Sequence, residues 1–505
     1  MRPMVENYPF FSIFACMVAG ILCAVIKKGK TAWYLTIGVC ALTALLSALT
    51  LAAVGEGDGY AFVYTMGRFA APYGNAIRVG PLQALLTMVF AGVMALALTG
   101  GSRDLFHDVQ EKKLPLYCTM CCMTLASLLA LTYTNDVFTG YVFIEISTIA
   151  ACALVMAKDT GPNLIATIRY LFMSLLGSGL FLIGLTFLNA VTGYLLMPSL
   201  STAIADLAAS GQYHVPLTVS AGLMVAGLGV KSAMFPFHLW LPGAHGGATT
   251  TSSAILSGLV LKGYIVLMIV LMVRVFGLAL MVEMGMTTVV LLFGLMGMIF
   301  GSVSAIREHH VKRMLAYSSV AQIGYIFMGL GLGSPAGIVA SCFHILVHAT
   351  CKPLLFLCAG RLSAVSGHHR SLKNLRGSAY RDIAAGIGFT VGALSMIGIP
   401  LFGGFVSKLY FASASLNSNG MVMVLLTIAL STVLNALYYV PAVLAIWITP
   451  PPELQQHILE ISDPREAEFD RNFTIAAVIL MAGVFVLGIF YHPILDVIQM
   501  GVQLL

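Results

Sequence analysis

Charged side chains are scarce in this chain. Only 9% of its 505 residues are Asp, Glu, Lys or Arg, whereas 59% are hydrophobic. Soluble domains carry about a quarter charged residues, so this composition excludes a soluble enzyme. The chain also lacks the GxGxxG and Walker patterns that bind nucleotide phosphates, and it has no basic patch of the kind that binds nucleic acid.

Cysteine is present but not in a pattern that indicates bound metal or disulfides. The ten cysteines lie in or beside apolar runs, without the spaced loop pairs of a disulfide or zinc framework. Cys118, Cys121 and Cys122 are close enough to suggest a metal or cluster site, but packing of small polarisable side chains in a helix is the favoured interpretation. We therefore expect no cofactor and no metal in this chain.

Long apolar runs dominate the sequence. About 20 apolar residues span a bilayer as a helix, and the chain has room for about fourteen such segments. The first run lacks a basic n-region and a cleavage site, so we expect a retained helix rather than a signal peptide. The sequence predicts an all-α integral membrane protein with helices near 8–26, 33–54, 81–100, 114–133, 137–157, 164–188, 217–240, 250–273, 285–305, 311–332, 336–360, 383–411, 421–448 and 472–490.

Basic residues alternate along the predicted loops. The odd-numbered loops carry most of them, and the even-numbered loops carry only Arg68, Arg78 and Arg274. By the positive-inside rule the odd loops are cytoplasmic and both termini lie outside. Two loops are long: 189–216 is predicted as an outer connection, and 449–471 as a cytoplasmic hairpin or short surface helix. The basic residues of the odd loops are Lys27, Lys28, Lys30, Arg103, Lys112, Lys113, Lys158, Arg307, Lys312, Arg313, Arg361, Arg370, Lys373, Arg376 and Arg381.

Two neighbouring apolar runs each carry one lysine deep in their hydrophobic part, Lys231 and Lys262. A lysine at the bilayer centre costs roughly 2.5–3.5 kcal/mol, so it is retained where it faces a partner or a wet path. Pro236 and Pro242 follow Lys231, and because proline removes a backbone donor, we expect the seventh helix to bend or break just beyond its lysine. A broken helix beside a buried charge is typical of an ion site.

Acidic residues are nearly absent from the apolar runs, which makes Glu145 conspicuous near the middle of one. Intramembrane ionisable groups indicate function by default, although a neutralised glutamate can serve helix packing. Arg169 opens the next helix, where it is either an interfacial anchor or a partner of Glu145.

His344, His348 and Lys352 recur every four residues and therefore share one helix face. Packing does not easily explain two histidines and a lysine on one stripe, so we favour a proton path. A cation bound by His-x-x-x-His is the competing chemistry. His238 and His245 follow the predicted break, where they either relay protons towards the inner surface or cap the break.

Lys408 follows Gly398-Ile-Pro-Leu-Phe-Gly-Gly-Phe405, so helix-breaking residues again lie beside an intramembrane lysine. This repetition predicts a break in the twelfth helix and two related halves, with helices four to eight matching nine to thirteen. The predicted division is 1–113 (helices one to three), 114–275 (first repeat), 285–448 (second repeat) and 449–505 (cytoplasmic loop and final helix).

Several motifs resemble one known family. They are Lys231-x-x-x-Phe-Pro-x-His-x-Trp-Leu-Pro-x-Ala-His245, Ser257-Gly-x-x-Leu-Lys262, Lys312-Arg-Met-Leu-Ala-Tyr-Ser-Ser-Val-Ala-Gln-Ile-Gly-Tyr325, His344-Ile-Leu-Val-His348 and Gly404-Phe-Val-Ser-Lys408. Together they are similar to the antiporter-type subunits of respiratory complex I, of membrane-bound hydrogenases and of the multiple-resistance-and-pH (Mrp) sodium/proton antiporters. The match covers most of the chain, although Ala248-Thr-Thr-Thr251 stands where family members often have prolines.

The resemblance implies two inverted five-helix repeats and assembly with other membrane and peripheral subunits. It implies an ion pair between Glu145 and Lys231, and a proton route from that pair to Lys408. Lys262 and the stripe of His344, His348 and Lys352 lie between these ends. With Glu145 close, Lys231 stays charged; once the pair separates, it loses its proton or repels one at Lys262.

We therefore expect an ion-translocating subunit, conducting protons or exchanging sodium for protons, in the cytoplasmic membrane of a prokaryote. Any redox centre would lie in other subunits, because this chain has no loop clusters of ligands. A non-redox Mrp-type antiporter is the alternative, and a stand-alone solute transporter or a structural scaffold is more remote. A solute carrier would show a pocket with few titratable groups, and a scaffold would not need six buried charges.

Overall fold

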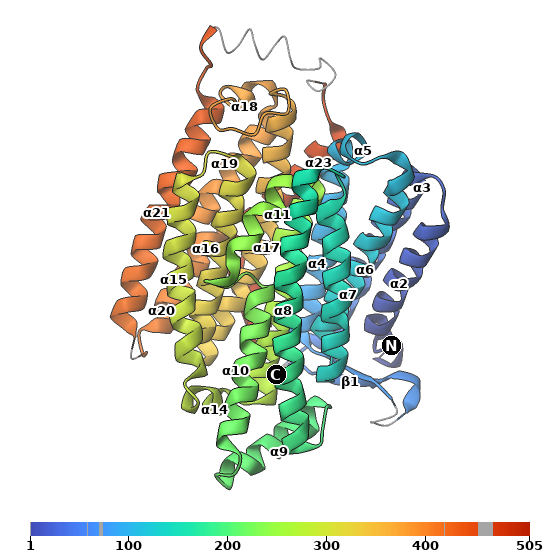
Figure 1. Ribbon diagram of the computed structural model, residues 1–505, viewed down its shortest axis with the longest axis vertical. Helices are drawn as coiled ribbons and strands as arrows, with labels where there is room; N and C mark the ends of the chain where they lie inside the picture. Colours follow the sequence, from blue (N-terminus) through green and yellow to red (C-terminus); the bar gives the residue numbers. More distant parts are fainter. Residues whose placement is uncertain (1, 58, 70–73, 419, 453–467) are drawn as a thin grey trace.

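The computed structural model describes residues 2–57, 59–69, 74–418, 420–452 and 468–505, which form a bundle of long helices (Figure 1). Within these residues, thirteen helical segments are long and apolar enough to cross a membrane, in agreement with the predicted all-α membrane class. They are α2 (Tyr8–Val25), α3 (Gly29–Val54), α4 (Pro81–Gly100), η2–α6 (Glu111–Tyr133), α7 (Val137–Met156), α8 (Gly161–Thr192), α10 (His214–Lys231), the composite segment Thr250–Val275, α15 (Met286–Arg307), α16 (Val311–Gly331), α17 (Pro335–Ala364), α21 (Met421–Trp447) and α23 (Arg471–Ile489).

Both predicted helix breaks are present. Lys231 is the last residue of α10, and the chain continues through η3 (Phe237–Trp240) into the short helix α11 (Leu241–Gly247). The predicted twelfth span consists of α19 (Ile383–Ile397) and α20 (Gly403–Ser415), each too short to cross a bilayer alone. Each break leaves backbone carbonyl groups at the end of its first half without the usual helical partners.

The composite segment Thr250–Val275 is the most irregular long helix. It comprises α12 (Thr250–Ile255), the π-helical turn η4 (Leu256–Val260), α13 (Leu261–Val270) and a second π-helical turn, η5 (Leu271–Val275). Wide turns of this kind are rare and are frequently found at functional sites.

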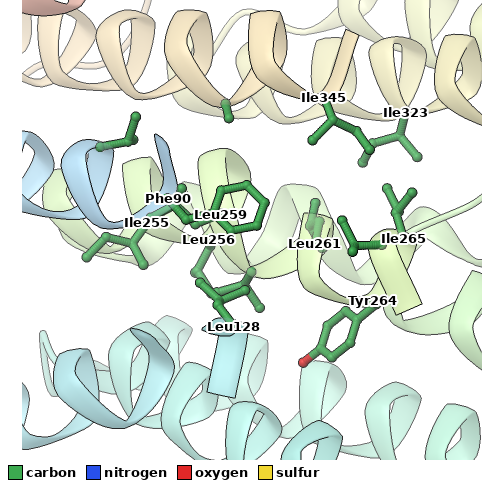
Figure 2. Packing of buried hydrophobic residues seen from close by; sticks show 14 of the residues in the cluster. Phe90, Leu128, Ile255, Leu256, Leu259, Leu261, Tyr264, Ile265, Ile323 and Ile345 are labelled. Carbon is green, nitrogen blue, oxygen red and sulfur yellow. The ribbon is translucent and has the colours of Figure 1, made fainter. Parts of the chain in front are cut away.

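This segment lies at the centre of the bundle together with α16 and α17. The apolar windows of Thr250–Val275 and α17 are 100% buried, whereas those of α3 and α21 are 28% buried. Figure 2 shows Leu259 and Leu261 packed between Leu128 of α6 on one side and Ile323 and Ile345 of α16 and α17 on the other. Helices in lipid associate through such close van der Waals packing, which leaves the central polar side chains no access to lipid.

Several elements differ from the sequence prediction. The connection at 189–216 is largely helical, because α8 continues to Thr192 and α9 (Met197–Ala209) follows. A hairpin of β1 (Phe62–Thr65) and β2 (Ala76–Val79), paired antiparallel with Phe62 opposite Val79, and the C-terminal helix α24 (Tyr491–Gln503) were not predicted. Most of the predicted surface segment 449–471 lies outside the described residues. The remaining short elements are α1 (Arg2–Val5), η1 (Met66–Arg68), α5 (Ser102–Asp108), η2 (Glu111–Lys113), α14 (Leu278–Glu283) and α18 (Ser378–Arg381).

The cysteines contribute to helix packing. Cys16 lies 3.5 Å from the Thr43 hydroxyl, and Cys122 lies 3.6 Å from the Thr36 hydroxyl, so these thiols join α2 and α6 to α3. Such contacts agree with the packing interpretation of the cysteine cluster.

The loops predicted as basic gather at one end of the bundle. Lys113 pairs with Asp159 at 2.6 Å, and Lys158 pairs with Asp108 at 2.8 Å, which joins loops from different parts of the chain. Figure 1 places α11 and α18 toward this end, whereas α9 and β1 lie toward the other end. Both chain termini lie nearer the α9 end.

Candidate functional site

Within the part of the chain that the structure describes, five lysines are buried inside the bundle, and the exposed fraction of each is 7% or less. Such positions are costly for an ammonium group unless polar atoms surround it. The five are Lys231, Lys262, Lys312, Lys352 and Lys408.

Lys231 lies beside Glu145, as expected. Its Nζ atom is 4.0 Å from a Glu145 carboxylate oxygen, it donates a 2.6 Å hydrogen bond to Thr148, and it lies 5.5 Å from the centre of the Tyr264 ring. The two partners differ in exposure, because the Lys231 side chain is 1% exposed and that of Glu145 is 27% exposed. The pair therefore has one fixed, buried end on α10 and one accessible end on α7.

Lys262 lies at the junction of the first π-helical turn with α13. Its ammonium donates to the carbonyl oxygen of Ser257, at the start of that turn. The Ser257 hydroxyl lies 2.8 Å from the Ser319 hydroxyl on α16. A wide turn alters the regular hydrogen-bond ladder, which explains why a backbone oxygen can accept the lysine.

The predicted stripe on α17 is fully buried, but its members face different neighbours. His344 Nδ1 lies 2.9 Å from the Ser407 hydroxyl of α20, and the His344 and His348 rings are 6.3 Å apart. Lys352 instead donates to the Leu315 carbonyl at 2.9 Å and to Ser318 at 2.8 Å, both on α16. His344 therefore faces α20 at the second helix break, whereas Lys352 faces α16.

Lys408 occupies the second break. Its ammonium donates to the carbonyl of Ile397, the last residue of α19, and to the Thr432 hydroxyl at 3.0 Å. Gly398 turns the chain with φ of +93°, and a Cβ atom there would lie 2.8 Å from Lys408 Cδ. Glycine is thus required both by the backbone conformation and by the lysine beside it. A helix C-terminus carries partial negative charge, which favours a cation at this position.

Carbonyl and hydroxyl oxygens, rather than carboxylates, hold most of these ammonium groups. Among the described residues, Lys231 is the one buried lysine that has a carboxylate within 4.0 Å. Neutral acceptors can hydrogen-bond an ammonium but do not compensate its charge. Among the described residues, the other four buried lysines have no carboxylate within 4.0 Å, an arrangement therefore suited to groups that take up and release protons.

The structure places the three accessory candidates, His238, His245 and Arg169, in different environments. His238 is 5% exposed and stacks on Phe235, whereas His245 is fully buried against Phe356 with ring centres 4.8 Å apart. Arg169 is exposed on α8, and among the described residues no ion pair within 4.0 Å joins it to Glu145, which is consistent with an interfacial position.

The metal alternative at His344 and His348 needs further ligands. No group of three or more His, Cys, Asp or Glu side chains in the described ranges is arranged to hold a metal ion. His344 instead contacts a serine hydroxyl, and both ring nitrogens of His348 are buried without a hydrogen-bond partner in the described protein.

The sequence did not single out several polar residues that are buried in the same part of the bundle as the lysines. Lys312 was assigned to a basic loop, yet it is 2% exposed and donates a 2.9 Å hydrogen bond to the Ala248 carbonyl beside α11. Gln322 and Tyr325 on α16 are fully buried, and Lys408 lies 5.3 Å from the Tyr325 ring. The polar run Tyr317 to Tyr325 within an apolar helix is the signal that could have identified this face.

Comparison with known proteins agrees with the geometry. The family described as "NADH:quinone oxidoreductase/Mrp antiporter, TM" matches residues 134–434. The chain is 30% identical over 472 residues to NADH-quinone oxidoreductase subunit N of Desulforudis audaxviator, covering 91% of each chain. It is 29% identical over 386 residues to a Na(+)/H(+) antiporter subunit of Bacillus subtilis, covering 76% of this chain and 75% of that one.

Solved structures share the fold. A chain of the archaeal membrane-bound sulfane sulfur reductase superposes with a TM-score of 0.83 at 24% identity, covering 99% of this chain and 96% of that one. A chain of the Mrp complex from Dietzia superposes with a TM-score of 0.86 at 22% identity, covering 99% and 97%. On the family match and the near full-length relatives, the chain belongs to the NADH:quinone oxidoreductase/Mrp antiporter family of transmembrane subunits.

Proposed function

We propose that this chain is the proton-translocating membrane subunit of a complex-I-like or membrane-bound-hydrogenase-like oxidoreductase. The observation that carries the proposal is the buried row of titratable side chains from Glu145 to Lys408, in which a carboxylate accompanies one lysine and neutral oxygens hold the others. Relatives named as NADH-quinone oxidoreductase subunit N and F(420)H(2) dehydrogenase subunit N support the redox-linked assignment.

The switch in this mechanism is the Glu145–Lys231 pair. At 4.0 Å the carboxylate stabilises the charged form of Lys231. When the pair opens, Lys231 keeps only the Thr148 hydroxyl and the Tyr264 ring as partners, so its charge is poorly compensated. The proton then leaves Lys231, or its charge repels a proton on Lys262.

The middle of the route consists of hydroxyl and imidazole groups. Ser257 and Ser319 join Lys262 to α16, and Ser318 on the same helix accepts from Lys352. The ring nitrogens of His348 are buried without protein partners among the described residues, and buried polar atoms in native proteins generally bind water. Water at these atoms would continue the path towards His344.

The second end of the route is Lys408. Ser407 contacts His344 at 2.9 Å, and the neighbouring Lys408 is held by the carbonyl that the break in α19–α20 exposes. The break at Lys231 and the break at Lys408 have the same design, with a lysine at or opposite the end of an interrupted helix. This likeness supports the proposal of two inverted repeats, helices four to eight and nine to thirteen.

A sodium/proton antiporter complex without redox chemistry is the second candidate. The similarity to the antiporter subunit of Bacillus subtilis and the fold shared with the Dietzia Mrp complex favour it. A stand-alone solute transporter is disfavoured, because cavities of 770 and 600 Å³ lie at opposite ends of the bundle and the buried centre holds titratable groups.

The loop charges further support placing the chain in a prokaryotic cytoplasmic membrane with both termini outside. The basic end that carries Arg370 and Lys373 would then be cytoplasmic.

The test is ion translocation by the intact complex in proteoliposomes. We expect Lys352→Met to abolish acidification reported by a pH-sensitive dye, and exposed Lys373→Met to leave it unchanged. An electron donor drives the redox-linked complex, whereas a sodium gradient alone drives an antiporter. Wild-type translocation in Lys352→Met, with subunit content intact, would contradict the proposal.

A further inference from the structure

A cavity of 770 Å³ opens beside the first helix break and is separate from the buried row of lysines. Its wall is formed by the start of α8, by η3 and α11, by the start of α16 and by the loop after α17. This is the basic end of the bundle, and nothing in the translocation route uses it.

The cavity wall is positively charged. It contains Lys158, Arg169, Arg313 and Arg370, and the described lining contains no Asp or Glu. Two of these charges have carboxylate partners, because Lys158 lies 2.8 Å from Asp108 and Arg313 lies 3.9 Å from Glu308.

Arg169 and Arg370 are different. Neither has a carboxylate within 4.0 Å among the described residues. Arg370 donates to the Gly246 carbonyl at 2.8 Å, which fixes its direction but leaves its charge uncompensated. A guanidinium group has five N–H donors, so most of the donors of both side chains remain available for an anion.

The buried part of the wall offers another donor. Asn163 is 2% exposed, and its Nδ2 atom has no hydrogen-bond partner in the described protein. The other amide atom, Oδ1, is closely backed by Gly247, where a Cβ atom would lie only 1.9 Å away. Asn163 also belongs to the first turn of the long helix α8, whose free N–H groups and dipole favour an anion.

The histidine in the cavity wall, His310, adds no negative charge to it. Burial lowers the pKa of His310 to about 4, and the charges of Arg370, Lys312 and Arg313 act in the same direction. A positive potential therefore persists at neutral pH although His310 itself is neutral.

The mouth of the cavity is apolar. Ile165 is 56% exposed and Leu239 is 75% exposed, and Trp240 forms part of the wall. Tryptophan and exposed aliphatic side chains beside arginine are typical of the level where lipid headgroups meet acyl chains. Basic pockets between transmembrane helices on the cytoplasmic side commonly hold anionic headgroups.

We propose that this cavity binds a phosphate group through Arg169, Arg370 and Asn163, supplied by the headgroup of an anionic phospholipid or by free phosphate. The phosphate oxygens accept from the two guanidinium groups and from the Asn163 amide. If the phosphate belongs to a phospholipid, its acyl chains extend out of the cavity beside Ile165 and Leu239.

The test uses the purified complex in phosphatidylcholine nanodiscs that contain either photoreactive phosphatidylglycerol or photoreactive phosphatidylcholine. Cross-linked peptides are mapped by mass spectrometry, and binding of radiolabelled inorganic phosphate is measured in parallel. We expect phosphatidylglycerol adducts near Ile165 and Leu239 to exceed phosphatidylcholine adducts at least about tenfold. A tenfold preference corresponds to a difference of about 1.4 kcal/mol in binding free energy.

The variant Arg169→Gln/Arg370→Gln should remove this preference. The lysine pair Arg169→Lys/Arg370→Lys should retain part of it, and Arg376→Gln, an exposed cation at the same end and outside the cavity, should retain all of it. Equal labelling by both lipids, together with phosphate binding that the glutamine pair abolishes, would support the proposal and identify free phosphate as the source.

Equal labelling without phosphate binding would overturn the proposal, and so would cross-linking of this mouth to a neighbouring subunit. Lipid cross-linking and phosphate binding do not require ion transport, so the results of both measurements are independent of the proposed translocation function.

Discussion

Replacing Glu145 with Gln tests the switch at the start of the route. The substitution keeps the size of the side chain and removes its charge, so Lys231 loses the carboxylate that lies 4.0 Å away. Two unit charges at this distance interact by about 1 kcal/mol in water and about 4 kcal/mol at an effective dielectric constant of 20. Because the Glu145 side chain is 27% exposed, we expect an intermediate value of about 2 kcal/mol.

A loss of about 2 kcal/mol in the transporting state corresponds to a roughly 30-fold lower rate. Lys231→Ala should cause a similar loss, and the double variant should be little worse than either single variant, because the two residues act as one unit. The assay is dye-reported acidification per complex, driven by the complex's own electron donor or by a sodium gradient, with assembly checked by subunit content.

The control must be a carboxylate without a structural role. Exposed Glu111→Gln satisfies this requirement. Normal translocation in Glu145→Gln, or strictly additive losses in the double variant, would refute the ion-pair mechanism.

Other predictions address conformation, topology, cofactors and pH. Gly398→Ala should lower the thermal midpoint of the assembled complex and reduce transport, because φ of +93° costs a non-glycine residue about 1–3 kcal/mol and the added Cβ meets Lys408. Cysteine introduced at Lys373 should react with an impermeant maleimide from the cytoplasmic side and cysteine at Ser210 from the outside; labelling of both from one face would contradict the topology. The purified chain should show no flavin, haem or iron–sulfur absorption, and stoichiometric iron would contradict this. His310 accepts the Arg313 N–H at the start of α16 with a pKa of about 4 against an ordinary 6.5, so the unfolded chain binds more protons between these values. The thermal midpoint should therefore fall as pH decreases from 6.5 to 4, and His310→Asn, which keeps an acceptor, should weaken that dependence.

The sequence predicted the features that arise from strong local signals. Apolar runs of bilayer length identified the spans, and Pro236 and Gly398 indicated the two breaks, because proline lacks a backbone N–H donor and glycine readily adopts the positive φ that ends a helix. Lys231, Lys262 and Lys408 could be identified because a charged residue inside an apolar run is costly and therefore rare.

Features that depend on tertiary packing were not predictable in this way. Lys312 looked like a loop cation because it begins a helix, and the fold alone places the Ala248 carbonyl over it. The carbonyl acceptors of Lys262 and Lys352 are backbone atoms, which leave no mark in the sequence. The α9 helix and the β1–β2 hairpin are short and carry weaker signals than the spans.

Ion translocation by a complex that carries Lys262→Met is the measurement that tests the central claim most directly. Lys262 is fully buried in the central segment and donates to a backbone carbonyl, so methionine can replace its volume while removing its charge. If protons move along the buried row, the reconstituted complex should assemble with wild-type subunit content and lose translocation, whereas exposed Lys112→Met should translocate normally. Wild-type translocation by an intact Lys262→Met complex would contradict a route through these lysines.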